Sequence, residues 1–126
     1  MLAIATGCEL DVERGPDWLF VRVRSFKRDT LNSWHLADEL WSLLERHSTH
    51  RLVLELDRVP TLNEHLVDQL SDLYARVHEH GGVLRICGLS EAGCRVLSAC
   101  ELVEHCHPYS CREEAVLGHP LVRRPR

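Results

Sequence analysis

The chain has 126 residues, 44% hydrophobic and 27% charged, which is typical of one globular domain. Its net charge is −4, and its cations cluster only in the last four residues, which argues against nucleic acid or an anionic membrane as the main partner. No segment approaches the ~20 apolar residues of a membrane helix. The first eight residues lack the basic start of a signal peptide. We therefore expect a cytoplasmic protein with one domain over residues 1–119 and a mobile basic tail over residues 120–126.

The chain has six cysteines, and none forms a C-x-x-C pair. Several lie among apolar residues, where a reduced thiol packs as a small hydrophobic side chain. In a cytoplasmic chain of this size we expect no disulfide framework.

The first third of the chain predicts strands followed by a helix. Residues 1–8 are expected to form a first strand. Residues 10–14 and 18–24 alternate in polarity around the turn Gly15-Pro16-Asp17, which predicts a β-hairpin. Asn32 and Ser33 are favourable N-cap residues. An apolar stripe with helical spacing follows and predicts a helix over residues 34–47.

The remainder of the chain alternates strands and helices. Residues 52–56 and 83–87 are nearly continuous apolar runs typical of buried strands. Between them, residues 64–79 predict an amphipathic helix that ends at Gly81-Gly82. A third helix is expected from Ser90, a short edge strand over residues 105–107, and a last helix from Ser110 to Gly118. Ser110 and Glu113 have the spacing of a capping box.

This alternation indicates βαβ units and therefore an α/β fold with a right-handed, largely parallel sheet. We expect four to five strands in a mixed, mostly parallel sheet and about four helices. The strands at residues 52–56 and 83–87 are expected to be adjacent and parallel at the centre of the sheet, with the helix over residues 64–79 packed on them.

Residues 51–70 run from a strand through a short loop into a helix, and this segment resembles the STAS domain, the family of bacterial anti-sigma factor antagonists. The family motif at the helix start is D-S-S-G-L-x-x-L, where this chain has Asn63, Glu64, His65 and Leu66. Residues 81–86, 97–102 and 113–116 resemble later landmarks of the family, so the resemblance covers nearly the whole chain. It implies a single STAS-like domain with the element order β-β-α-β-α-β-α-β-α.

The resemblance implies a non-enzymatic regulatory domain that acts through protein contact and needs no cofactor. Its partner would be an anti-sigma factor or a related kinase-like regulator, and self-association or contact with other STAS proteins are further options. In phosphorylatable members, the second serine of the motif accepts phosphate, which abolishes binding to the anti-sigma factor by adding negative charge. His65 replaces that serine here. The resemblance implies partner contact through the loop and helix start: Thr61, Asn63, Glu64, His65 and Leu66.

Three interpretations of this altered motif stay open. The surface binds its partner constitutively, without a switch. Alternatively, Glu64 acts as a permanent substitute for phosphate, and the fold serves as a scaffold. In the third, the segment is only a well-capped helix start, through Asn63 or through a capping box of Thr61 with Glu64. Phosphorylation of His65 itself is a further option.

The alternative class of function is a small-molecule- or metal-binding α/β domain. His105, His107 and Cys111 offer zinc donors, but their spacing matches no standard zinc pattern. Glu55 and Asp57 form an acidic pair near a strand end, where doubly wound sheets bind ligands. The chain has no P-loop, no nucleophile elbow and no G-x-G-x-x-G motif. We therefore expect no enzymatic activity.

Overall fold

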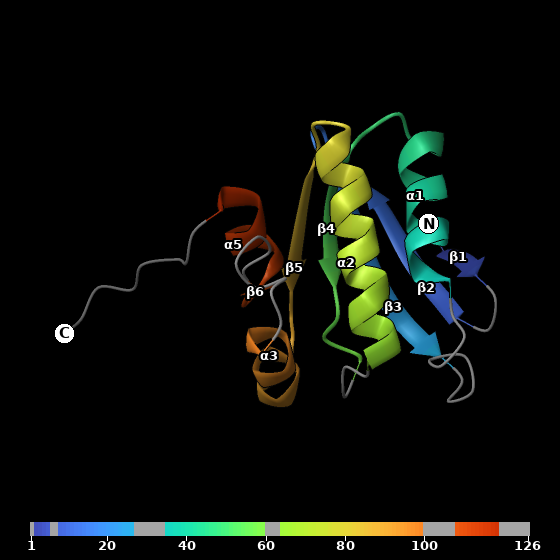
Figure 1. The fold of residues 1–126 in the computed structure, drawn as a ribbon. Helices are drawn as coiled ribbons and strands as arrows, with labels where there is room; N and C mark the ends of the chain where they lie inside the picture. The colour runs from blue at the N-terminus through green and yellow to red at the C-terminus, as the bar shows by residue number, and fades with distance from the viewer. Residues whose placement is uncertain (1, 6–7, 27–34, 60–63, 100–107, 119–126) are drawn as a thin grey trace.

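Figure 1 shows the computed structural model, which describes residues 2–5, 8–26, 35–59, 64–99 and 108–118. Several predictions fall outside these residues. They concern the cap residues Asn32 and Ser33, the loop residues Thr61 and Asn63, the edge strand over residues 105–107, and the tail over residues 120–126.

The described strands form one six-stranded sheet in chain order: β1 (Leu2–Ala5), β2 (Cys8–Arg14), β3 (Leu19–Phe26), β4 (Arg51–Glu55), β5 (Val83–Cys87) and β6 (Pro108–Tyr109). The first three strands pair antiparallel, which confirms the predicted hairpin. Strands β3 to β6 pair parallel. The α/β class and the mixed, mostly parallel sheet are confirmed. The sheet has one strand more than the four to five expected, because β1 and the two-residue β6 both pair with it.

Four described helices accompany the sheet: α1 (Leu36–Arg46), α2 (Glu64–Glu79), α3 (Glu91–Ser98) and α5 (Arg112–Leu117). Helices α1 and α2 lie side by side against one face of the sheet (Figure 1). The main hydrophobic core lies between them and β2 to β5. In the described residues, no helix combines the length and apolar character needed to cross a membrane.

Helix α2 has the predicted bounds, and it packs on the predicted pair of parallel strands. Leu70, Leu73 and Val77 are buried on its inner face. The helix ends in a Schellman-type turn, in which Gly81 has a φ of 71° and the Gly82 N–H donates to the Val77 carbonyl at 2.8 Å. The strong 3.6-residue period and the double glycine explain why this element was predictable.

Two helix starts differ from the expected ones. Helix α1 has His35 at its N-cap, without a side-chain cap. Its Ala37 N–H donates instead to Gln69 Oε1 of α2, at 3.0 Å.

Helix α5 has Cys111 at its N-cap, also without a side-chain cap. Its expected Ser110–Glu113 box is replaced by a bond from the Ser110 N–H to Glu114 Oε1 at 3.1 Å. By contrast, the Ser90 hydroxyl caps α3 as expected, accepting from the Gly93 N–H, and Gly118 ends α5 with a φ of 80°.

Candidate functional site

The start of α2 lies at the edge of the sheet where the parallel strands end. After β4, the Leu56 N–H donates to the Cys87 carbonyl at 3.0 Å, which holds the departing chain against β5. The Val59 N–H donates to the Leu56 carbonyl at 3.0 Å, and the Val59 side chain is buried. These contacts hold residues 56–59 against the sheet before the loop. Helix α2 then begins at Glu64.

The three described residues of the altered motif have different environments. Glu64 is exposed in the first turn of α2, where a carboxylate interacts favourably with the positive end of the helix dipole. His65 is half-buried. Leu66 is 1% exposed and belongs to the main core. A partner can therefore contact Glu64 and His65 directly, whereas Leu66 anchors the helix start from beneath.

Helix α2 is held to α1 by polar contacts along its length. Besides the Gln69 contact, Arg76 Nη2 lies 2.6 Å from Asp38 Oδ1 of α1 and 3.3 Å from Asp72 Oδ2. The hydrogen bond that Arg76 donates to Asp38 raises the pKa of the guanidinium. Polar contacts therefore join the two helices from Gln69 to the last turn of α2.

A buried carboxylate lies at the same edge of the sheet, on the face opposite α1 and α2. Glu55, at the end of β4, is 4% exposed. It accepts from Arg112 Nη2 at 2.7 Å and from Arg112 Nε at 3.3 Å, and Arg22 Nη2 lies 3.3 Å away. Arg22 Nε is also 3.2 Å from Asp57 Oδ1. The acidic pair Glu55 and Asp57 is thus neutralised by two arginines, so it is not an open acidic site.

A cavity of about 530 Å³ opens beside this cluster. Its lining residues are Arg22, Glu55, Asp57, Cys87, Gly88, Ser110, Cys111, Arg112 and Glu113. Burial and the negative charge of Glu55 raise the pKa of the Cys87 thiol to about 12. Hydrogen bonding to Glu55 raises the pKa of Arg112. The thiol is therefore protonated at neutral pH and is a poor nucleophile.

The metal alternative finds no support in the described part of the chain. Within it, no group of three His, Cys, Asp or Glu side chains is arranged to hold a metal ion. Cys111 lines the cavity, and its predicted co-ligands His105 and His107 lie outside the described residues. Cys87, Cys94 and Cys111 are free thiols.

The STAS domain family model matches residues 9–115 of the chain. The chain belongs to the STAS domain family. The match runs from the second residue of β2 to β6 and into α5, and it includes α1, α2 and α3. A sequence comparison with curated proteins finds no significant match.

Solved structures show the same fold at low sequence identity. The Thermotoga maritima protein TM1081 is 13% identical with a TM-score of 0.73, covering 86% of this chain and 92% of its own. An anti-sigma factor antagonist from Mycobacterium paratuberculosis is 18% identical with a TM-score of 0.71. The likeness covers 93% of this chain and 97% of that protein. A variant of RsbS from Moorella thermoacetica is 12% identical with a TM-score of 0.71. The likeness covers 86% of this chain and 92% of that protein. This STAS domain therefore has the architecture of anti-sigma factor antagonists.

The roles of Arg22 and Arg112 were missed from the sequence. Arg22 faces Glu55 across the parallel pair of β3 and β4, so correct pairing of these strands would have predicted that contact. Arg112 reaches Glu55 from a helix 57 residues further along the chain, and no local pattern signals it.

Proposed function

We propose that this STAS domain is a non-enzymatic, cytoplasmic regulator in a bacterial transcription control system. It acts by binding an anti-sigma factor or a related kinase-like regulator through the start of α2. The observation that carries the proposal is that Glu64 is exposed and His65 is only half-buried on a helix whose inner face, including Leu66, is anchored in the core. The family match and the structural likeness to anti-sigma factor antagonists support this choice of partner.

We further propose that serine phosphorylation does not switch the binding. The acceptor position is His65, and residues 64–70 contain no hydroxyl group. Glu64 carries a fixed negative charge at the helix start, where phosphate would add charge in a switchable member. Partner binding is then constitutive, and its affinity depends on the side chains in the first turn of α2.

The docking surface is tested by charge reversal at two ends of one helix. Glu64→Arg is expected to weaken binding of the anti-sigma regulator from the same organism by about tenfold or more, because it reverses a charge at the centre of the contact. Glu79→Arg is the matched control, since Glu79 is exposed at the opposite end of α2. Isothermal titration calorimetry measures both. Equal affinities for the two variants would place the contact elsewhere.

The missing switch is tested with the anti-sigma kinase, ATP and magnesium. We expect no phosphate on residues 61–66 of the natural chain. In the His65→Ser variant we expect phosphorylation of the introduced hydroxyl, read by mass spectrometry. His65→Ala is the control for loss of the imidazole without gain of a hydroxyl. Phosphate at Thr61 or His65 in the natural chain would show that the switch has moved.

A further inference from the structure

The two faces of the sheet are covered unequally. Helices α1 and α2 cover one face over the main core. On the opposite face, the short helix α5 covers a small cluster of buried residues: Val53, Cys87 and Ala115. Trp18, Phe20 and Tyr109 pack against this cluster but are only partly buried. Large aromatic side chains are therefore accessible on this face.

Two arginines lie against these aromatic rings. The guanidinium carbons of Arg51 and Arg85 are each 5.6 Å from the centre of the Trp18 ring, and that of Arg85 is 5.7 Å from the Tyr109 ring. All three distances are within the range of cation–π attraction. Arg85 Nη1 also donates to the Ala115 carbonyl at 2.9 Å, so it joins the rings to α5.

Exposed apolar side chains extend this surface along α5. Val116 is 37% exposed and Leu117 is 53% exposed. We call the whole surface the aromatic–arginine patch, and its members are Trp18, Arg51, Arg85, Tyr109, Val116 and Leu117. Trp, Tyr and Arg are the residues most enriched in the energetic centres of protein interfaces.

The patch carries positive charge without acidic partners. The ion pairs formed among the described residues involve Arg22, Arg76, Arg95 and Arg112. Within that part of the chain, neither Arg51 nor Arg85 belongs to an ion pair. The cation–π contacts leave both guanidinium charges uncompensated, so the patch favours an acidic surface.

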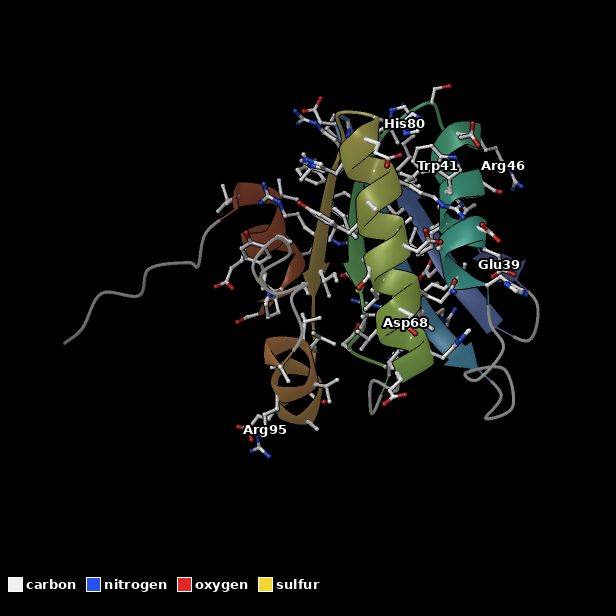
Figure 2. All side chains as sticks on the ribbon, in the orientation of Figure 1. Glu39, Trp41, Arg46, Asp68, His80 and Arg95 are labelled. Carbon is white, nitrogen blue, oxygen red and sulfur yellow. The ribbon has the colours of Figure 1, made fainter. Side chains whose placement is uncertain are left out.

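The helix layer of the same chain is such a surface. Helices α1 and α2 together carry seven carboxylates and two arginines, a net charge of −5. Asp68 is exposed and Glu39 is half-buried, and both are labelled on these two helices in Figure 2. The helix layer is thus acidic, and the two arginines of the patch on the opposite face of the sheet carry the complementary charge.

We propose that the aromatic–arginine patch binds the acidic helix layer of a second copy of this chain. The contact is heterologous, because different surfaces of the two copies meet, and repetition produces a head-to-tail chain or a closed ring. The apolar residues Val116 and Leu117 supply buried area, and the charges fix the orientation. The patch has few side chains, so the association is weak and concentration-dependent.

Sedimentation equilibrium of the protein alone tests the contact, independently of any other partner. At about 1 mM protein and about 50 mM salt, the weight-average mass is expected to reach about 1.5 times the monomer mass of 14.5 kDa or more. At about 500 mM salt it returns towards the monomer, because the charges are screened. The Arg51→Glu/Arg85→Glu variant is expected to remain monomeric. Its matched control is Arg58→Glu/Arg95→Glu, which reverses two exposed arginines outside the patch and keeps the association.

A mixing experiment distinguishes head-to-tail contact from any other geometry. The helix-layer variant Glu39→Arg/Asp68→Arg and the patch variant are each expected to be monomeric. An equimolar mixture is expected to form a heterodimer, because one variant keeps the patch and the other keeps the acidic layer. The single variant Arg51→Glu repeats the test and keeps the hydrogen bond from Arg85 to the Ala115 carbonyl of α5. Circular dichroism verifies that each variant is folded.

Three results would overturn the proposal. The natural chain stays monomeric at about 1 mM protein, the patch variant associates as strongly as the natural chain, or the mixture stays monomeric. Binding of a labelled single-stranded oligonucleotide by the natural chain but not by Arg51→Glu, without self-association, would assign the patch to nucleic acid instead.

Discussion

Glu55 is a charged side chain in a position where an unpaired charge is costly. It is 4% exposed on the sheet, and an isolated carboxylate in such a place loses several kcal/mol of hydration. Two hydrogen bonds from Arg112 and the nearby guanidinium of Arg22 offset that loss. Arg112 also pairs with Glu13 of β2 and lies over the Phe20 ring, with its guanidinium carbon 4.3 Å from the ring centre. One arginine therefore ties α5 to three strands.

Replacing Arg112 with leucine is expected to lower the free energy of unfolding by about 2 kcal/mol. The loss is smaller than for a fully buried pair, because the Arg112 side chain is 35% exposed and Arg22 still compensates Glu55. Urea denaturation measures the change. Arg95→Leu is the control, since its pair with Glu91 is largely exposed and its loss is expected to cost less than about 0.5 kcal/mol. Equal losses in the two variants would show that Glu55 does not need Arg112.

Cys87 gives the domain a pH dependence in the alkaline range. Its folded-state pKa of about 12 is above the ordinary value of 9.0, so the folded state keeps a proton that the unfolded state releases. The thiol makes its full contribution to the free energy of unfolding below about pH 9. This contribution falls as the pH rises towards 12, by at most about 1.4 kcal/mol per pH unit. The Cys87→Ala variant is expected to show a shallower decline in the free energy of unfolding between about pH 8.5 and pH 10.5. Cys94→Ala is the control for the loss of a thiol elsewhere in the domain.

At the scale of elements, α1 depends on α2 for its N-terminal cap. The Gln69 side chain accepts from the Ala37 N–H, one of the first backbone donors of α1, which have no partner within the helix. His35 supplies no side-chain bond there. The cap is therefore a contact between helices, and it forms only when α1 and α2 pack together.

Gln69→Ala is expected to lower the free energy of unfolding by about 1 kcal/mol, the usual cost of losing a helix cap. Gln69→Glu keeps an acceptor at the same place and is expected to retain most of the stability. Ser71→Ala, at an exposed position on α2, is the control for a substitution without a cap. Thermal and urea unfolding measure all three. If Gln69→Glu is as damaging as Gln69→Ala, the cap contributes little and packing explains the loss.

The ends of helices and strands were predicted well where residues close in sequence set them. They were not predicted where a residue far away in the sequence sets them. The start of α3 at Ser90 and the end of α2 at Gly81 are set by neighbouring residues, and both were predicted correctly. The first turn of α1 is capped by Gln69, 32 residues away, and no local pattern in the sequence indicates that contact.

At the scale of the molecule, the sheet separates two surfaces of different character. Its helix-covered face holds nearly all the buried hydrophobic residues and carries an acidic outer layer. Its other face combines the Glu55 cluster at the ends of the parallel strands with the aromatic–arginine patch. The proposed partner site on α2 and the proposed contact between copies both follow from this asymmetry.

The sequence by itself determined the α/β class, the alternation of helices and strands after β3, the bounds of α2 and the pairing of β4 with β5. These features depend on hydrophobic periods and glycine turns, which are local and repeat along the chain. It also indicated the altered motif at residues 63–66, because His65 stands where a serine would be expected.

Only the tertiary structure decided which motif residues are accessible and which charges are paired. Leu66 is in the core while Glu64 is exposed, and that difference depends on how α2 packs on the sheet. The neutralisation of Glu55 by Arg112 and the approach of Arg85 to Trp18 join residues more than fifty positions apart. Such contacts are set by strand register and helix packing, which no local pattern encodes.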